Sequence, residues 1–266
     1  MSGRFAKGCT LDRGKHQYTA FEIAKARRLA TAVPPVAVDL AAFAPPTMNQ
    51  TEFSCCEGMS TSGAIVTALA KAGTPLPWIP SQVDIYRLAR CLERKSPSEK
   101  LADDGTFTNA VIRAITEFGI RPMGPSPAGL FCDVTHANVN EEPKLDELEK
   151  DALTLLLGAY RIASTGAHKV QDVKLALASG FAVRVDTEVD QAFEDWIPTR
   201  GPYGAPDTAN SLGGHAVYCI AYDHDVFTIR NSWGPDWGDG KGNIVVSGEF
   251  IKAADVYCWN VRKAAK

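Results

Sequence analysis

The sequence predicts an α+β fold in which a mainly helical first half and a β-rich second half meet at a cleft. Helix-length segments rich in small and aliphatic residues fall between residues 56 and 118, and glycines end two of them. After residue 160 the chain changes to short, apolar, alternating runs separated by turns, which are typical of strands. Hydrophobic residues at 45% and charged residues at 22% indicate an ordinary soluble globular protein.

The first half begins with an extended segment and continues with three helices. Residues 36–40 lie between two proline pairs, which favour extended backbone on the residues before them. Residues 56–71 predict a buried helix, with Ser54 as its cap and Gly73 as its end. Two further helices are expected over residues 81–95 and 107–118, and a loop that crosses to the second half is expected over residues 122–143.

The second half is predicted to hold two helices and a set of strands. The helices are expected over residues 145–157, where three leucines follow one another, and over residues 170–178. The strands are expected over residues 160–162, 181–185, 215–221, 225–230, 242–247 and 256–259. The turn at Asp223-His224 joins two of these strands into a β-hairpin.

Charge and composition limit the classes of partner. The net charge of -3 gives no reason to expect a nucleic-acid partner or an anionic membrane surface. Residues 1–37 form a basic N-terminal arm, which is either a solvated segment or a docking arm for an acidic protein partner. The rest divides into a helical half, residues 38–143, and a β-rich half, residues 144–266.

Seven cysteines make an odd number without regular spacing, so at least one thiol is unpaired within the chain and a disulfide framework is not expected. The sequence shows no evident signal peptide and no window of 18 uninterrupted apolar residues. These features favour a reducing, cytoplasmic location, with a phage particle (virion) as the alternative.

Three short elements carry chemistry: Gln50-Thr51-Glu52-Phe53-Ser54-Cys55-Cys56 before a helix, Gly213-Gly214-His215-Ala216-Val217 opening a strand, and Asn231-Ser232-Trp233-Gly234 after a strand. A thiol attacks a carbonyl as the thiolate, and its ordinary pKa of about 8.5 leaves little thiolate at neutral pH. A helix N-terminus and a nearby imidazolium both stabilise the thiolate. Cys56 and His215 therefore predict a nucleophile and its acid/base partner.

Together and in this order, the elements resemble the papain-like cysteine peptidase family, closest to its bacterial and phage members. The resemblance begins at Val38-Asp39-Leu40, continues through the proline pair Pro45-Pro46 and the turn Asn49-Gln50-Thr51, and extends to the C-terminus. His215 follows Cys56 by roughly 160 residues, close to the interval of about 130–150 in such enzymes. The resemblance implies a papain-like fold, a peptide or protein substrate, hydrolysis of peptide bonds through a thioester acyl-enzyme, and no cofactor or metal.

The resemblance also implies a role for each site residue. Cys56 is the catalytic nucleophile and His215 the general acid and base. Asn231 orients the imidazole ring, and Trp233 shields the His-Asn pair from water. Gln50 donates to the oxyanion together with the backbone N–H of Cys56.

The chain departs from the family pattern beside the nucleophile. Thr51 replaces a glycine, Phe53 replaces a cysteine that pairs in a disulfide, and Glu57 replaces an aromatic residue. Glu57 suits the helix dipole, but its carboxylate beside the thiolate is expected to reduce reactivity. Cys55 is an alternative nucleophile if the alignment slips by one residue, although the six-residue spacing from Gln50 selects Cys56.

Two other interpretations remain open from the sequence. The first is a catalytically silent papain-like module with a peptide-binding or structural role in a larger assembly such as a phage particle; Glu57, Thr51 and an N-terminal arm shorter than the family's usual prosegment favour it. The second is zinc binding by Cys55, Cys56 and His215, which lack partners at ligand spacing. The other histidines are expected to be structural or at the surface: His16, His136, His168 and His224.

Overall fold

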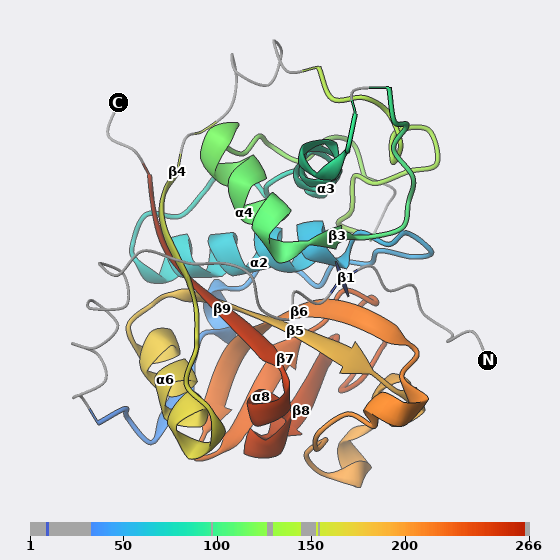
Figure 1. The fold of residues 1–266 in the computed structure, drawn as a ribbon. Helices are drawn as coiled ribbons and strands as arrows, with labels where there is room; N and C mark the ends of the chain where they lie inside the picture. Colours follow the sequence, from blue (N-terminus) through green and yellow to red (C-terminus); the bar gives the residue numbers. More distant parts are fainter. Residues whose placement is uncertain are drawn as a thin grey trace.

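The computed structural model of the 266-residue chain describes residues 9–10, 33–96, 98–126, 130–144, 153 and 155–263. Three helices lie on one side of a large antiparallel sheet, and two further helices cover its other side (Figure 1). The sheet has seven strands in the order β4-β9-β5-β6-β7-β8, with β2 paired to β6 outside this path. No helix in these ranges combines the length and apolar character needed to cross a bilayer.

The strands of the sheet all pair antiparallel. Strand β6 lies between β5 and β7, and β6 and β7 form the predicted hairpin. The bounds are β2 Ala37–Asp39, β4 Leu155–Arg161, β5 Ala182–Val189, β6 Gly213–Asp223, β7 Val226–Arg230, β8 Asn243–Ser247 and β9 Asp255–Lys263.

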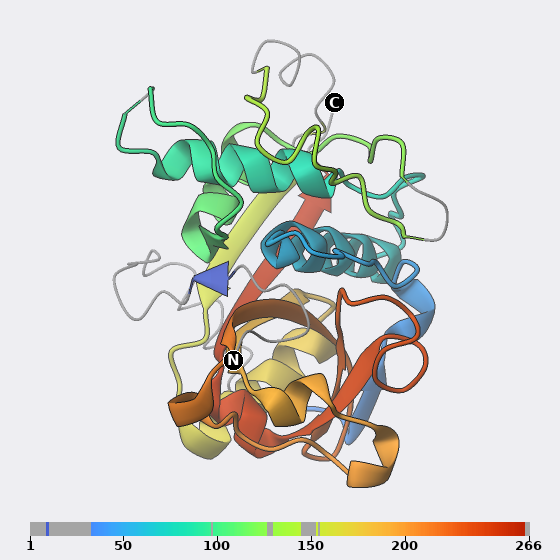
Figure 2. The same ribbon diagram turned by 90° about the vertical axis from the view of Figure 1, so that its right-hand side faces the viewer.

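The helical half consists of α2, Cys56–Lys71, α3, Gln82–Glu93, and α4, Thr108–Glu117. Helix α2 lies directly on the sheet, because small residues line the side that meets it. A Cβ added at Gly63 would lie 2.5 Å from the ring of Tyr218 in β6. The first turn of α2 also meets β6, because Cys56 packs against Ala216, and Figure 2 shows α2 between α3 and the sheet.

Two apolar cores lie on opposite faces of the sheet. The first joins α2, α3 and α4 to side chains of β6 and β9 such as Ile220 and Trp259. The second fills the space between the other face and the helices α6, Gly166–Ala178, and α8, Gly248–Ala253. The junction of the two halves is therefore itself packed core, which holds the helix start and the strand start in a fixed relation.

Short elements complete the described chain. A two-stranded parallel sheet pairs β1, Cys9–Thr10, with β3, Thr106–Phe107. The remaining short helices are η1 Ala41–Phe43, α7 Gln191–Glu194, η2 Pro198–Arg200 and η3 Thr208–Asn210.

Some local predictions were wrong. The helix expected over residues 145–157 does not include residues 155–157, which belong to strand β4 and pair with β9. Residues 145–152 lie outside the described residues. Ser54 does not cap α2, because Cys55 occupies the N-cap position and no side chain caps it. Helix α6 begins at Gly166, four residues before the prediction, and α8 was not predicted.

Candidate active site

Cys56 is the first residue of α2, where the positive end of the helix dipole lies. Its side chain is fully buried and packs in one apolar cluster with Ala216 and Cys9. Ala216 follows His215 in β6, so the nucleophile predicted in the front half meets the strand that carries the predicted acid/base residue. Both segments reach this point through the contact of α2 with β6.

His215 and Asn231 form the hydrogen bond that the resemblance implies, with 2.7 Å between Nε2 and Oδ1. The backbone N–H of Ser232 also donates to Asn231 Oδ1, at 2.7 Å. Because an amide oxygen only accepts, Nε2 must be the donor and carries a proton. The proton exchange with a thiol is therefore left to Nδ1, the other ring nitrogen.

Aromatic rings surround this pair. The Trp233 ring stacks on His215 with 4.6 Å between centroids, and Phe193 meets Trp233 edge-on at 5.7 Å. His215, Asn231 and Trp233 are at most 5% exposed. In this environment with little water, the hydrogen bond is stronger and the ring has little freedom to turn.

Gln50 is fully buried and its amide is held at both ends. The hydroxyl of Ser232 donates to Oε1 at 2.5 Å, and Nε2 donates to the carbonyl of Phe53 at 2.8 Å. An amide nitrogen carries two hydrogens, so Nε2 can donate to a second acceptor. Ser232 thus contacts both Gln50 and Asn231, a double role that its sequence position did not indicate.

A buried ionic cluster lies beneath the first turn of α2. The Arg184 guanidinium, in β5, donates to both carboxylate oxygens of Glu57 and to Asp186 at 2.7 Å. Thr108 bridges the group from α4, because its hydroxyl contacts Arg184 and Asp186. These four side chains are fully or almost fully buried, and we call them the Arg184 cluster. It joins α2, α4 and β5 directly beside Cys56.

The charges of the Arg184 cluster do not balance if every group is ionised. One guanidinium faces two carboxyls in a site without water, so burial raises the pKa of Glu57 to about 8 and also raises the pKa of Asp186. The pKa of Arg184 is raised by the two carboxylates, which keeps the guanidinium charged. At neutral pH Glu57 therefore keeps its proton and adds less negative charge beside Cys56 than its sequence position suggests.

Within the described ranges, one group has the spacing of a metal site: a sulfur of Cys9 and carboxylate oxygens of Glu57 and Asp186 lie within 4.8 Å of one another. Arg184 already supplies positive charge to both carboxylates. A divalent cation here would face a buried guanidinium, so these residues do not fit a metal.

Cys55 faces away from Cys56. It is fully buried in a different apolar cluster, with Phe53, Met59 and Cys132. Burial raises its pKa well above the ordinary value, and a hydrogen bond with Cys132 raises it further. These features make Cys55 an unreactive thiol and argue against the one-residue slip. None of the seven cysteines is in a disulfide.

Thr51 has a φ of 51°, in the left-handed region where the family has glycine. A β-branched residue is strained in that region. The side chain of Asn49 holds the turn, because its Oδ1 accepts from the Thr51 N–H at 3.0 Å. Thr51 therefore holds a backbone conformation that suits glycine, at a cost in stability.

The other histidines that the structure describes lie at the surface. His136 pairs with Glu52 and His224 with Asp223, both on the surface, and His168 is exposed. His16 lies outside the described residues. The basic residues of the N-terminal arm before position 33 also lie outside them, so the docking arm stays a prediction.

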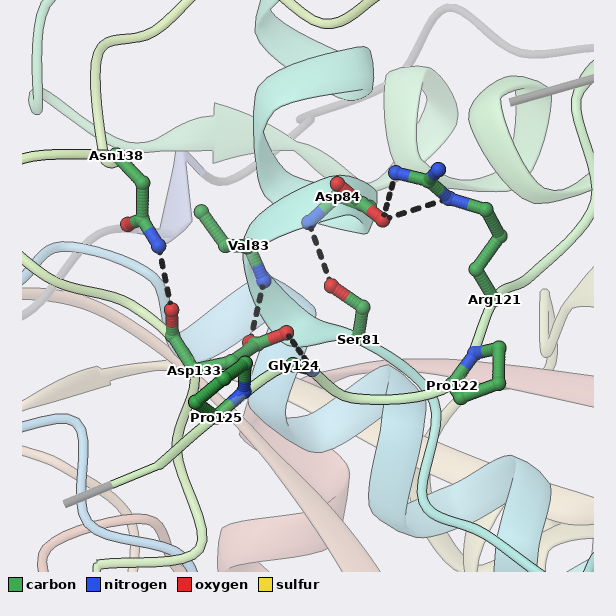
Figure 3. Close-up of a pocket in the computed structure, with 9 residues that line it drawn as sticks. All are labelled: Ser81, Val83, Asp84, Arg121, Pro122, Gly124, Pro125, Asp133 and Asn138. Carbon is green, nitrogen blue, oxygen red and sulfur yellow. Dashed lines mark hydrogen bonds and ion pairs between the residues drawn. The ribbon is translucent and has the colours of Figure 1, made fainter. Parts of the chain in front are cut away.

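In the part of the chain that the structure describes, two sizeable cavities are not lined by the predicted catalytic residues. One, of about 520 Å³, lies at the start of α3, where the Asp133 carboxylate accepts from backbone N–H groups and Asp84 binds Arg121 (Figure 3). These pairings fix a loop to α3, and none of the predicted site residues lines the cavity. The other, of about 380 Å³, is lined by Asp186 and Thr187, and Thr187 is the register partner of His215. That cavity adjoins the site.

Comparisons with known proteins agree on the architecture. No protein-family model matches the chain, and no curated protein matches it by sequence. Xylellain, a cysteine protease from Xylella fastidiosa, is 21% identical with a TM-score of 0.70, over 98% of this chain and 97% of that one. Procathepsin B S9 from Trypanosoma congolense is 15% identical with a TM-score of 0.64, over 94% and 85%. Bromelain from Ananas comosus, solved with the E64 inhibitor, is 17% identical with a TM-score of 0.57, over 84% and 97%. The chain therefore has the α+β fold of the papain-like cysteine proteases.

Proposed function

We propose that the chain is a cysteine peptidase that hydrolyses peptide bonds through a thioester acyl-enzyme. The observation that carries this proposal is the His215-Asn231 hydrogen bond at 2.7 Å on the strand that packs against Cys56. A tautomer fixed by Asn231, a thiol at a helix N-terminus and a held glutamine amide are the parts that acyl transfer needs.

In the first step, the thiolate of Cys56 attacks the carbonyl carbon of the scissile bond. The oxyanion that forms accepts from the backbone N–H of Cys56 and from Nε2 of Gln50, whose orientation Ser232 holds. His215 then donates the proton on Nδ1 to the leaving amine, and the C–N bond breaks. The products are a thioester on Cys56 and the free amine.

In the second step, Nδ1 of His215 takes a proton from water, and the oxygen attacks the thioester carbonyl. Collapse of this intermediate releases the carboxylic acid and restores the thiolate-imidazolium pair. An amine in place of water would give acyl transfer through the same thioester, so hydrolysis and transfer share every residue named here.

The test is labelling with E-64, the reagent in two of the similar protease structures, followed by peptide mass spectrometry, in parallel with hydrolysis of a fluorogenic peptide library. We expect an adduct on Cys56, and we expect His215→Ala to lower the labelling rate and the hydrolysis rate by about 100-fold or more. His224→Ala is the matched control, because His224 is exposed and has no part in the proposed mechanism. A folded protein that never labels on Cys56 and cleaves nothing would refute the proposal and favour the silent module.

A further inference from the structure

Cys56 is covered by a segment from the start of the chain. The side chain of Cys9, in β1, shares its apolar cluster with Cys56 and Ala216. Strand β1 pairs in parallel with β3, with Cys9 opposite Thr106, and also contacts β6. In Figures 1 and 2, β1 lies where the helices meet the sheet. Because Cys56 is 0% exposed, a substrate reaches its sulfur only after a segment packed on it, such as β1, has moved.

Cys9 is a second thiol with a defined environment, and the proposed mechanism does not use it. Its sulfur lies within 4.8 Å of carboxylate oxygens of Glu57 and Asp186, and it hydrogen-bonds to Glu57. Burial raises the pKa of Cys9 well above the ordinary value, and Asp186, Glu57 and Cys56 raise it further. Cys9 is therefore a protonated thiol that is hydrogen-bonded to the carboxyl of Glu57.

We propose that Cys9 and Cys56 are a redox modification site, at which a hydroperoxide converts the two thiols into an intrachain disulfide. The bond holds β1 across the nucleophile and keeps the proposed peptidase inactive until a thiol reductant opens it. This inference rests on the proposed function only for the reactivity of Cys56 and for the consequence of blocking it.

The chemistry balances with hydrogen peroxide as the oxidant. The thiolate of Cys56 attacks one peroxide oxygen, the O–O bond breaks, and Cys56 becomes a sulfenic acid as hydroxide leaves. The sulfur of Cys9 then attacks the sulfenic sulfur, and a second hydroxide leaves. The protons of the two thiols neutralise the two hydroxides, so two thiols and one peroxide give one disulfide and two waters. Sulfur is oxidised and oxygen is reduced.

Cys9 suits this role better than the cysteine next to Cys56 in the sequence. Cys55 packs with Phe53 and Cys132 on the helical side, whereas Cys9 and Cys56 share one cluster. A disulfide needs two Cβ atoms that point toward a common position. Capture of the sulfenic acid by Cys9 also prevents further oxidation of Cys56 to sulfinic and sulfonic acids, which are irreversible states.

The experiment uses the reduced full chain. It is treated with hydrogen peroxide, its remaining thiols are blocked with N-ethylmaleimide, and it is digested without reductant for peptide mass spectrometry. We expect a peptide that joins Cys9 to Cys56 as the main product. E-64 labelling of Cys56 should fall by more than tenfold and return with dithiothreitol. Because the tryptic peptide that contains Cys56 also contains Cys55, the linkage is assigned in Cys55→Ser, which should still form it.

Two variants complete the design. In Cys9→Ser and Cys9→Ala, the same treatment should drive Cys56 to sulfinic and sulfonic acid, and dithiothreitol should not restore labelling. Cys91→Ser is the matched control, since Cys91 is a half-buried thiol on α3, and it should behave like the wild type. A Cys55-Cys132 disulfide as the main product, or over-oxidised Cys56 in the wild type with Cys9 still reduced, would overturn the proposal.

The two proposals fail in distinguishable ways. The linked peptide is measured by mass and needs no peptidase activity, so linkage without any hydrolysis would refute the proposed function and leave the redox site standing. Active peptidase with no linkage would refute the redox site alone.

Discussion

Replacing Arg184 with Met tests whether the Arg184 cluster holds the two halves together. Met removes the charge and the donors but keeps an apolar chain of similar length beside Trp259 and Tyr257, over which Arg184 lies. Glu57 and Asp186 then lose their buried counter-charge. Removing one partner of a buried ion pair costs about 3–5 kcal/mol of the free energy of unfolding, and for a chain of this size that lowers Tm by on the order of 10 °C.

The size of this loss depends on pH in a defined direction. Without Arg184 the two buried carboxyls are tolerated only when protonated, so the loss should be smallest near pH 5 and largest near pH 8. Urea unfolding followed by tryptophan fluorescence at pH 5, 7 and 8 measures it. Arg113→Met is the matched control, because Arg113 pairs with Glu117 on the surface of α4, where a pair contributes about 0.5 kcal/mol or less. A loss below about 1 kcal/mol at pH 8 would refute the reasoning.

Three further predictions follow from the same contacts. Burial raises the folded-state pKa of Glu57 to about 8. The free energy of unfolding that this protonated carboxyl contributes is therefore complete below about pH 4.5 and is lost as the pH rises through 8. Asp186→Asn leaves Glu57 as the one carboxyl beside Arg184 and should flatten this pH dependence in urea titrations. An unchanged slope would show that Asp186 does not raise the pKa of Glu57. Ser232→Ala removes the 2.5 Å bond to Gln50 and should lower kcat about 3- to 10-fold with little change in KM, whereas an unaltered kcat would exclude a positioning role. Thr51→Gly relieves the φ of 51° and should raise the free energy of unfolding by about 1 kcal/mol in chemical denaturation, and a decrease would show that Thr51 is not strained.

Much of the fold was accessible from local sequence. The helices at 56–71 and 82–93, and the hairpin of β6 and β7, follow from patterns that repeat within one element, because each element's backbone bonds and buried face depend on residues a few positions apart. Local pattern was insufficient at residues 155–157, where leucines that favour a helix form a strand because β9 offers them pairing partners.

The sequence by itself determined the fold class and the order of the three segments that carry the predicted site residues. Each of these segments is short, so the residue types and spacings around Gln50, Cys56, His215 and Asn231 can be recognised locally. Only the tertiary structure decided what surrounds Cys56. Arg184 lies 127 residues from Glu57, and no local pattern links them. Cys9 likewise reaches Cys56 through a two-residue strand. Such contacts arise when packing of the two halves brings distant segments into one buried volume, where each charge must find a partner.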